Sequence, residues 1–418
     1  MNKRPPREPN LFRSAGARLL LAGAVFIVVY GFCNRLTATR ADVGVWMWDW
    51  ERHIPFIREF IVPYWSLDLF FCGAFFLCRS RAELDLLTKR LVAVVLASGV
   101  CFLLFPLQMG LPRPEPAGWT APLFRALYAG DMPYNLAPSL HISLRSILWV
   151  CYGAHLRGGL RRTAKMWFML IGLSTLLVWQ HHVLDVAAGF LMAWAILSVF
   201  PEPKQVIQAP RAPRLALLYG LGSLACAALA FLWAGFAWPA VSLGIVALAY
   251  ATGRPHLLGK ENGALSPAAE WCLLPVLLAS KLIQLRWRRS APAWLELSPG
   301  VFFGRRPSRR EAARLVAGQA LAVLDLTAER SAPAALREQT DCYLNLPLPD
   351  LLAPSPQALE SALAFIRRHH ATRRVLVHCE LGLGRSVRVA ERWLVEAGRH
   401  RDETEARAWL RERIPTLP

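Results

Sequence analysis

The residues best suited to covalent chemistry lie in the run Val-His-Cys-Glu-Leu-Gly-Leu-Gly-Arg-Ser at 377–386. A cysteine thiolate can attack phosphorus, and the amides of a glycine-containing loop at a helix N-terminus favour the thiolate and bind phosphate oxygens. Cys379 is therefore a candidate nucleophile. The planar guanidinium of Arg385 can bind two phosphate oxygens, and Ser386 can donate a hydrogen bond to the departing sulfur. The other candidate phosphate-binding positions are Glu380, Leu381, Gly382, Leu383 and Gly384.

Cleavage of a phosphate ester also needs an acid that protonates the leaving oxygen. Asp350 lies upstream in the proline-rich run Leu-Pro-Leu-Pro-Asp-Leu-Leu-Ala-Pro-Ser. A carboxylic acid on a loop that closes over the site is the expected arrangement. The cysteine loop contains Glu380 and no lysine, which disfavours highly anionic inositol polyphosphates. Phosphoproteins and simple phosphate monoesters both stay open as substrates.

A second set of polar residues interrupts the apolar part of the chain. His181 and Asp185 are four residues apart, so they share a face if this segment is helical. A carboxylate bonded to one imidazole nitrogen raises the basicity of the other, which makes His181 a candidate nucleophile. His141 can protonate the leaving oxygen, and Arg113 and Ser139 can bind phosphate oxygens. Ionisable groups within a membrane are costly unless they have a function or a partner.

The elements that carry these residues fall into an apolar part and a soluble part. Of the 418 residues, 55% are hydrophobic, and the mean hydropathy is +0.31. This average fits a mixture of spanning helices and a soluble domain. The apolar runs predict eight spans, near residues 17–33, 56–78, 89–107, 138–155, 166–180, 183–200, 214–235 and 238–252.

The segment at 265–285 contains Glu270, Pro275 and Lys281, so we expect it to lie at the membrane interface rather than to cross. Beyond about residue 291 the apolar runs shorten. Short strands at 323–326 and 375–377 alternate with helices at 310–320, 356–369 and 386–397, which predicts a soluble α/β domain. The expected organisation is a tail, first span and loop at 1–55, a membrane core at 56–205, extra helices and an interfacial linker at 206–290, and a soluble domain at 291–418.

The charge pattern predicts the partners and the orientation. The formal net charge is +19, and basic residues cluster beside apolar runs. This favours anionic lipid headgroups and the positive-inside rule over nucleic acid. The basic loops alternate, so we expect an integral membrane protein of a bacterial-type inner membrane, with the soluble domain cytoplasmic and the histidine site on the opposite side. The nine scattered cysteines include no CxxC pair, and neither set of residues requires a metal or another cofactor.

The HCxxGxGRS run and the upstream Pro-Asp loop resemble the dual-specificity branch of the protein tyrosine phosphatase superfamily. The resemblance covers about residues 292–418. It implies that Cys379 is the nucleophile, that Arg385 binds phosphate and that Asp350 is the general acid.

The elements Arg113-Pro114, Pro138-Ser139-Leu140-His141 and His181-x-x-x-Asp185 resemble the type 2 phosphatidic acid phosphatase (PAP2) superfamily over roughly residues 60–200. The resemblance implies a multi-domain protein with an all-α membrane bundle in which His181 attacks, His141 is the acid or base, and Asp185 orients His181. Two cationic phosphate ligands of lipid phosphate phosphatases are replaced, by Pro106 and by Ser174-Thr175. The remaining set is closer to the branch of sphingolipid synthases and inositolphosphotransferases, which transfer a phospho-headgroup between lipids.

Three interpretations follow. In the first, the chain carries a lipid phosphatase or phosphotransferase site and a cysteine-dependent phosphatase site, acting on membrane lipids and on a phosphorylated substrate. In the second, the membrane part only anchors a signalling phosphatase. In the third, the chain is a transporter or a structural membrane protein.

Overall fold

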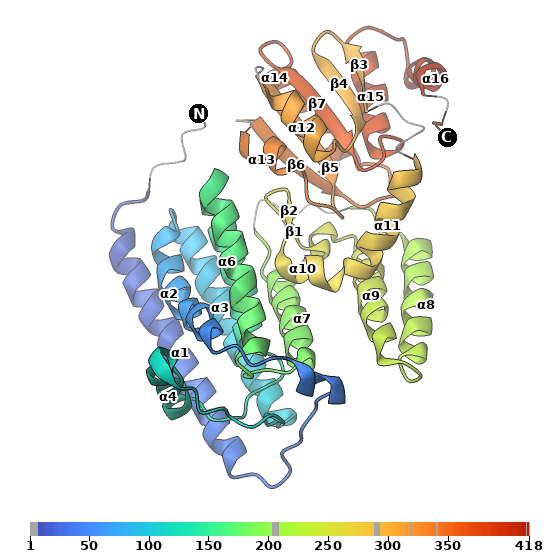
Figure 1. Ribbon diagram of the computed structural model, residues 1–418. Coiled ribbons are helices and arrows are strands. Elements are labelled where there is room, and N and C mark those ends of the chain that lie inside the picture. The colour runs from blue at the N-terminus through green and yellow to red at the C-terminus, as the bar shows by residue number, and fades with distance from the viewer. Residues whose placement is uncertain are drawn as a thin grey trace. The chain divides into compact units, whose positions relative to one another are not determined.

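The computed structural model describes residues 7–202, 209–287, 293–317, 320–339, 342–414 and 416–417. The chain divides into two compact units, with the boundary between Phe200 and Pro201. Each unit has its own hydrophobic core and is considered separately below, and Figure 1 shows the elements of both units.

The first unit is a bundle of helices. Its helices are α1 (Leu11–Ala38), α2 (Ile61–Leu77), α3 (Arg81–Leu104), α4 (Ala121–Gly130), α5 (Leu140–His155), α6 (Gly158–Leu177) and α7 (Val183–Val199). Six of the expected apolar segments coincide with α1, α2, α3, α5, α6 and α7. The short helix α4 was not expected. Serine side chains begin two of the helices, because Ser80 and Ser139 accept hydrogen bonds from amides of the first turns of α3 and α5.

Apolar residues lie on both the inside and the outside of this bundle. Phe75, Leu91 and Phe168 are fully buried in its core, whereas Leu20 and Leu69 are about three-quarters exposed. In the described residues of the whole chain, four helical segments are long and apolar enough to cross a bilayer: Leu11–Ala38, Arg58–Leu77, Arg81–Leu104 and Ala234–Thr252. Large apolar side chains facing outward from a helical bundle are compatible with a lipid environment.

The second unit begins with an antiparallel pair of helices, α8 (Pro213–Leu229) and α9 (Ala237–Thr252), which match the last two expected spans. A small hairpin of β1 (Lys260–Glu261) and β2 (Ala264–Leu265) follows. The segment expected at the membrane interface forms two helices, α10 (Pro267–Cys272) and α11 (Leu274–Trp287).

A five-stranded sheet forms the rest of this unit, which confirms the expected α/β domain. Its strands are β3 (Trp294–Ser298), β4 (Val301–Arg305), β5 (Leu321–Thr327), β6 (Cys342–Leu348) and β7 (Arg374–Cys379). The order is β3-β4-β7-β5-β6, in which β3 is antiparallel to β4 and the other pairs are parallel. The helices are α12 (Arg309–Val316), α13 (Ala334–Gln339), α14 (Pro356–His369), α15 (Arg385–Glu396) and α16 (Glu403–Arg413).

Apolar side chains of β7 point alternately to the two faces of the sheet, and helices cover both faces. Val375 and Val377 pack into the core formed with α14, α15 and α16, and Leu376 packs into the core formed with α12 and α13. The parallel strands β4, β5, β6 and β7 all end at one edge of the sheet. That edge carries the loops in which the chemically competent residues of this unit lie (Figure 1).

Candidate active sites

The cysteine loop connects the end of β7 to the start of α15. Cys379 is the last residue of β7 and is 2% exposed. Its Sγ accepts a hydrogen bond from the Gly382 amide at 3.3 Å and lies 3.2 Å from the Ser386 hydroxyl. A backbone amide and a hydroxyl thus lie beside one sulfur, where they can stabilise it as a leaving group.

Gly382 is required by the backbone of this loop. Its φ of +75° lies in the left-handed region, and a Cβ at this position would lie 2.7 Å from the backbone nitrogen of Arg305. The parallel pairing of β4 with β7 sets Arg305 beside Cys379, so the loop packs closely against the end of β4. Leu381 and Leu383 lie in the same loop, and Gly384 is the residue that precedes α15.

The guanidinium of Arg385 is fixed by three groups at the edge of the sheet. It donates two hydrogen bonds to the carboxylate of Glu329, at 2.6 and 2.8 Å, and one to the backbone oxygen of Leu348 at 2.7 Å. Its Nη2 also lies 3.0 Å from Oδ1 of Asp350. The structure therefore places the candidate phosphate-binding residue and the candidate acid together, and it adds a carboxylate that the sequence did not single out.

The two carboxylates around Arg385 have opposite pKa shifts. Burial raises the pKa of Asp350 above its ordinary value, although the Arg385 guanidinium opposes this rise. Burial alone would also raise the pKa of Glu329, but the ion pair and hydrogen bonds with Arg385 outweigh it and lower that pKa. Asp350 is thereby suited to hold a proton, and Glu329 is suited to stay ionised as the partner of Arg385.

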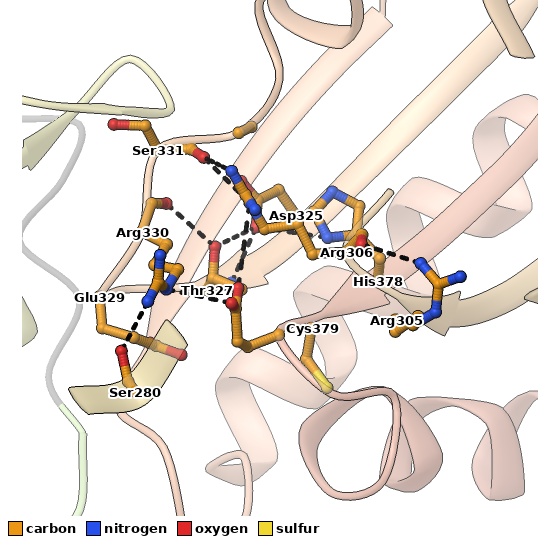
Figure 2. Close-up of polar contacts among 12 residues, drawn as sticks. Ser280, Arg305, Arg306, Asp325, Thr327, Glu329, Arg330, Ser331, His378 and Cys379 are labelled. Carbon is orange, nitrogen blue, oxygen red and sulfur yellow. Dashed lines mark hydrogen bonds and ion pairs between the residues drawn. The ribbon is translucent and has the colours of Figure 1, made fainter. Parts of the chain in front are cut away.

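A buried polar network lies next to the start of the cysteine loop, and Figure 2 shows its members Asp325, Thr327 and His378 near Cys379. Nζ of Lys260, from the β1–β2 hairpin, donates to Oδ2 of Asp325 at 2.7 Å and to the backbone oxygen and hydroxyl of Thr327 at 2.7 and 2.6 Å. Asp325 also accepts a hydrogen bond from the Tyr343 hydroxyl at 2.7 Å, and His378 Nδ1 is 3.8 Å from Oδ1. Burial raises the pKa of Asp325, but the Lys260 ammonium and the hydrogen bonds that the carboxylate accepts from Lys260 and Thr327 together outweigh it, and they hold that pKa well below its ordinary value.

The histidine that precedes the nucleophile is neutral. His378 is fully buried, and burial lowers its pKa to about 4. Its position next to Cys379, paired in register with Asp325 across the sheet, connects the network to the cysteine loop.

The side chain of Glu380, in the cysteine loop, forms ion pairs with two arginines outside the loop. One carboxylate oxygen lies 3.1 Å from Nε of Arg330, and the other lies 3.9 Å from Nε of Arg306. Burial raises its pKa, and the two arginines oppose this. The side chain of Glu380 therefore pairs with protein cations, so only its backbone amide is left for the phosphate-binding part that the sequence predicts for it.

In the first unit, the histidine pair is arranged differently from the expectation. His181 lies outside the helix, because α7 begins at Val183 and His182 is its N-cap residue. The segment between His181 and Asp185 is therefore not helical throughout, so the condition for a shared helix face is not met. Nδ1 of His181 nevertheless lies 3.7 Å from Oδ2 of Asp185, which is too long for a hydrogen bond. The same carboxylate oxygen accepts the His182 amide at 2.7 Å.

His182 ties two loops together. It is 1% exposed, its Nε2 accepts the Gly110 amide at 3.0 Å, and its Nδ1 lies 3.3 Å from Glu51. Glu51, which the sequence did not single out, also accepts the Val183 amide at 2.9 Å. These contacts orient the loop that carries His181.

Two further predicted residues of this unit, Arg113 and His141, are found at or near a pocket that His181 also lines. Arg113 and His181 line the same small pocket, which has a volume of about 10 Å³, together with Tyr30, Tyr64 and Asp131. Arg113 donates to the backbone oxygen of Asp131 at 2.8 Å. The ring of His141 stacks on Tyr64 with centroids 4.1 Å apart, and its Nε2 lies 3.1 Å from the Tyr64 carbonyl oxygen.

Ser139 is fully buried, and its hydroxyl accepts the Ile142 amide as a helix cap. Its own amide donates to the backbone oxygen of Asp185 at 2.9 Å, so it connects α5 to α7. Across the described ranges of both units, no three His, Cys, Asp or Glu side chains are grouped so that they could hold a metal ion.

Comparison with known proteins finds similarity in the C-terminal region. Residues 303–399 match the family model described as "Polymorphic toxin system, DSP-PTPase phosphatase". Among solved structures, the active form of Tk-PTP is 28% identical over 30% of this chain and 87% of that chain, with a TM-score of 0.28. A mutant form of Tk-PTP, in which a glycine is replaced by alanine, is 28% identical over 29% of this chain and 82% of that chain, with a TM-score of 0.26.

A putative phosphatase (DUF442) from Shewanella putrefaciens CN-32 is 17% identical over 29% of this chain and 83% of that chain, with a TM-score of 0.24. No curated protein matches the chain. The family match spans β7, the cysteine loop and all of α15. The C-terminal region of this chain therefore matches a phosphatase family of the dual-specificity, protein tyrosine phosphatase type.

Proposed function

We propose that this chain is an integral membrane enzyme with two phosphate-handling sites, a cysteine-dependent phosphatase site and a PAP2-like histidine site that acts on a lipid phosphate or a lipid phospho-headgroup. The observation that carries the first part is the geometry around Cys379. Its sulfur accepts the Gly382 amide, lies beside the Ser386 hydroxyl, and is followed by an arginine held at the sheet edge next to Asp350.

In the first half of the reaction, the Cys379 thiolate attacks phosphorus and forms an S–P bond while the ester P–O bond breaks. Asp350 gives its proton to the leaving oxygen. Arg385 and the loop amides bind the phosphoryl oxygens, whose charge is spread in the transition state. In the second half, Asp350 takes a proton from water, water attacks phosphorus, and the S–P bond breaks. Inorganic phosphate leaves, and Ser386 and Gly382 stabilise the returning thiolate.

This part is tested with the full-length protein in detergent and a generic aryl phosphate. We expect vanadate-sensitive hydrolysis that Cys379→Ser abolishes. Cys342→Ser, at a cysteine of β6 outside the loop, is the matched control and should retain the activity. Equal activity of wild type and Cys379→Ser would refute the proposed site. The same result would leave open the interpretation as a transporter or a structural protein.

For the membrane part, the support is the pocket that His181 shares with Arg113, with His141 stacked on Tyr64 nearby. A phosphate monoester dianion needs more cationic ligands than a diester monoanion does. The replacement of two cationic ligands by Pro106 and Ser174-Thr175 therefore favours a diester donor and transfer of its headgroup to an alcohol.

The assay for this part uses fluorescent phosphatidylglycerol or phosphatidylinositol as donor and diacylglycerol or ceramide as acceptor, with lipids separated by chromatography. His181→Ala should abolish transfer, whereas His53→Ala, at the exposed end of a short 3₁₀ helix, should not. Lipid profiles of cells that carry either variant extend the test to natural lipids. Identical lipid products from wild type and His181→Ala would favour the alternative, a signalling phosphatase anchored by an inactive membrane part. The 3.7 Å separation of His181 and Asp185 is the observation that favours this alternative.

The membrane location rests on the four helical segments of sufficient length and hydropathy. The alternating basic loops favour a cytoplasmic phosphatase domain and a histidine site on the other side of the membrane. Reporter fusions after residues 260 and 290 test this orientation.

A further inference from the structure

The loop that carries the general acid is attached to the helical pair α8–α9. The hydroxyl of Tyr250, near the end of α9, donates to the backbone oxygen of Asp350 at 2.8 Å. Tyr219 of α8 stacks on Tyr250, with ring centroids 5.6 Å apart and planes 10° apart. The acid of the phosphatase site is thereby fixed to the same end of α8–α9 as these two tyrosines.

The outer surface of α8–α9 is apolar, and the end near Asp350 is basic. No residue of α8 is buried, and its leucines at 217, 218, 221 and 224 are all more than half exposed. At the far end, Phe231 and Leu232 are 94% and 84% exposed. The 17 residues of α8 give a length of about 26 Å at 1.5 Å per residue. That length is close to the hydrocarbon thickness of a bilayer, about 30 Å.

Three exposed arginines flank the opposite end of the pair, namely Arg211, Arg214 and Arg254. Tyrosine and arginine side chains gather where a helix leaves the hydrocarbon and meets phosphate headgroups. With α8–α9 in a bilayer, the loop that bears Asp350 lies at the level of those headgroups.

Leu351, the residue after the acid, provides an apolar contact at this position. It is 70% exposed, and among the described residues from 293 onward it is the one large hydrophobic side chain that is more than about a third exposed. Its φ is +61°, a conformation that a leucine rarely adopts and that asparagine or glycine adopts more easily. An apolar side chain is thus kept next to the acid, in a backbone conformation that does not favour it and without cover from the protein.

From these contacts we infer that the Cys379 site takes its phosphate monoester from the headgroup of a membrane lipid. This inference rests on the proposed phosphatase function of that site. In it, α8–α9 sets the site at the bilayer surface, Tyr250 positions the acid loop, and Leu351 contacts the apolar part of the lipid. A soluble monoester with the same headgroup lacks the last contact, so the enzyme discriminates against it.

The test uses the full-length protein in phosphatidylcholine proteoliposomes. The probes are dioleoyl phosphatidic acid, phosphatidylglycerophosphate and a phosphatidylinositol monophosphate, each compared with its deacylated, soluble headgroup. The rate assigned to the site is the difference between wild type and Cys379→Ser, which removes any contribution from the histidine site. For at least one lipid, kcat/KM should exceed that of its soluble headgroup by on the order of 10-fold, the factor that contact with one leucine side chain can supply.

Two substitutions at one position examine the apolar contact. Leu351→Asn suits the left-handed backbone and removes the apolar side chain, so it should abolish most of the preference for the lipid without unfolding the loop. Leu351→Met retains an apolar side chain and should retain the preference. Thermal unfolding of both variants checks that the fold is kept.

The possible failures are distinguishable. Absence of any Cys379-dependent hydrolysis, including that of an aryl phosphate, would refute the proposed function. Cys379-dependent hydrolysis of the aryl phosphate with no preference for any of the three lipids would overturn the lipid inference alone. A lipid preference that Leu351→Asn leaves intact would also overturn it, because the contact assigned to Leu351 would then be absent.

Discussion

Replacement of Glu329 by glutamine tests how the phosphate-binding arginine is held. The carboxylate accepts two hydrogen bonds from Arg385, at 2.6 and 2.8 Å, and the guanidinium is 2% exposed. Glutamine retains one oxygen acceptor, but its amide group places a donor opposite a donor, and the charge is lost. Arg385 would then keep its contacts with the Leu348 carbonyl and with Asp350. We expect it to turn toward Asp350 and to bind phosphate less well.

The magnitude follows from one lost charge-assisted hydrogen bond. Such a bond contributes about 1.5–3 kcal/mol, and the lower part of this range applies because the side chain of Glu329 is 20% exposed. At about 1.4 kcal/mol for each factor of ten, kcat/KM for an aryl phosphate should fall roughly 10- to 30-fold. Since Arg385 acts in the transition state, kcat should fall with kcat/KM.

The assay is steady-state hydrolysis by the full-length protein across a pH series. Because the pKa of Glu329 is held below its ordinary value, the ion pair contributes above that value and is lost only as pH falls through the lowered pKa. The difference between wild type and Glu329→Gln should therefore be constant near neutral pH and shrink in acid. Glu360→Gln, which breaks an exposed ion pair with Arg367, is the matched control and should change kcat/KM less than twofold. Equal effects of the two substitutions would show that Arg385 does not depend on Glu329.

Three further predictions follow from the same region. Asp350→Asn should lower kcat about 10²- to 10⁴-fold and flatten the basic limb of the pH–rate profile. The reason is that burial raises the pKa of Asp350, so its protonated form persists toward neutral pH. If the basic limb were unchanged in the variant, the general acid would be another group. Lys260→Met should lower the free energy of unfolding by about 3–5 kcal/mol, because it leaves the Asp325 carboxylate buried without a counter-ion. Thermal unfolding measures this effect, with Lys281→Met at an exposed lysine as the control. Equal stability of the two variants would contradict the prediction. Gly382→Ala should abolish aryl phosphate hydrolysis while circular dichroism stays native, because the added methyl would meet the Arg305 backbone at a φ of +75°; retained activity would show that the loop can shift.

Local sequence patterns predicted the parts of the site that are contiguous in the chain. A nucleophile, two loop glycines, an arginine and a serine within ten residues specify a strand, a loop and a helix that need no distant partner. The eight apolar helices were predicted for a similar reason, because length and hydropathy are local properties. The structure confirms the strands at 323–326 and 375–377 and the three expected helices, although α12 ends at Val316 rather than at residue 320.

Residues that depend on strand order could not be predicted in this way. Glu329 follows β5 and reaches Arg385 only because β5 lies beside β7 in the sheet. Lys260 is 65 residues from its partner Asp325 and lies in a segment that the sequence presents as a linker. The spacing of His181 and Asp185 was interpreted with a helical period, but α7 starts at Val183, so a helix boundary that is two residues later removed the shared face.

The contact between Lys260 and Asp325 of the sheet determines where a shortened phosphatase fragment should begin. A fragment that starts at residue 286 or 291 contains every strand of the five-stranded sheet and the whole cysteine loop, but it lacks the only ammonium that contacts Asp325 among the described residues. Such a fragment would fold with the buried Asp325 carboxylate still hydrogen-bonded to Tyr343 but without its counter-ion, or would have to protonate it. A shortened enzyme that begins before the β1–β2 hairpin keeps its counter-ion, and soluble expression trials should start from there.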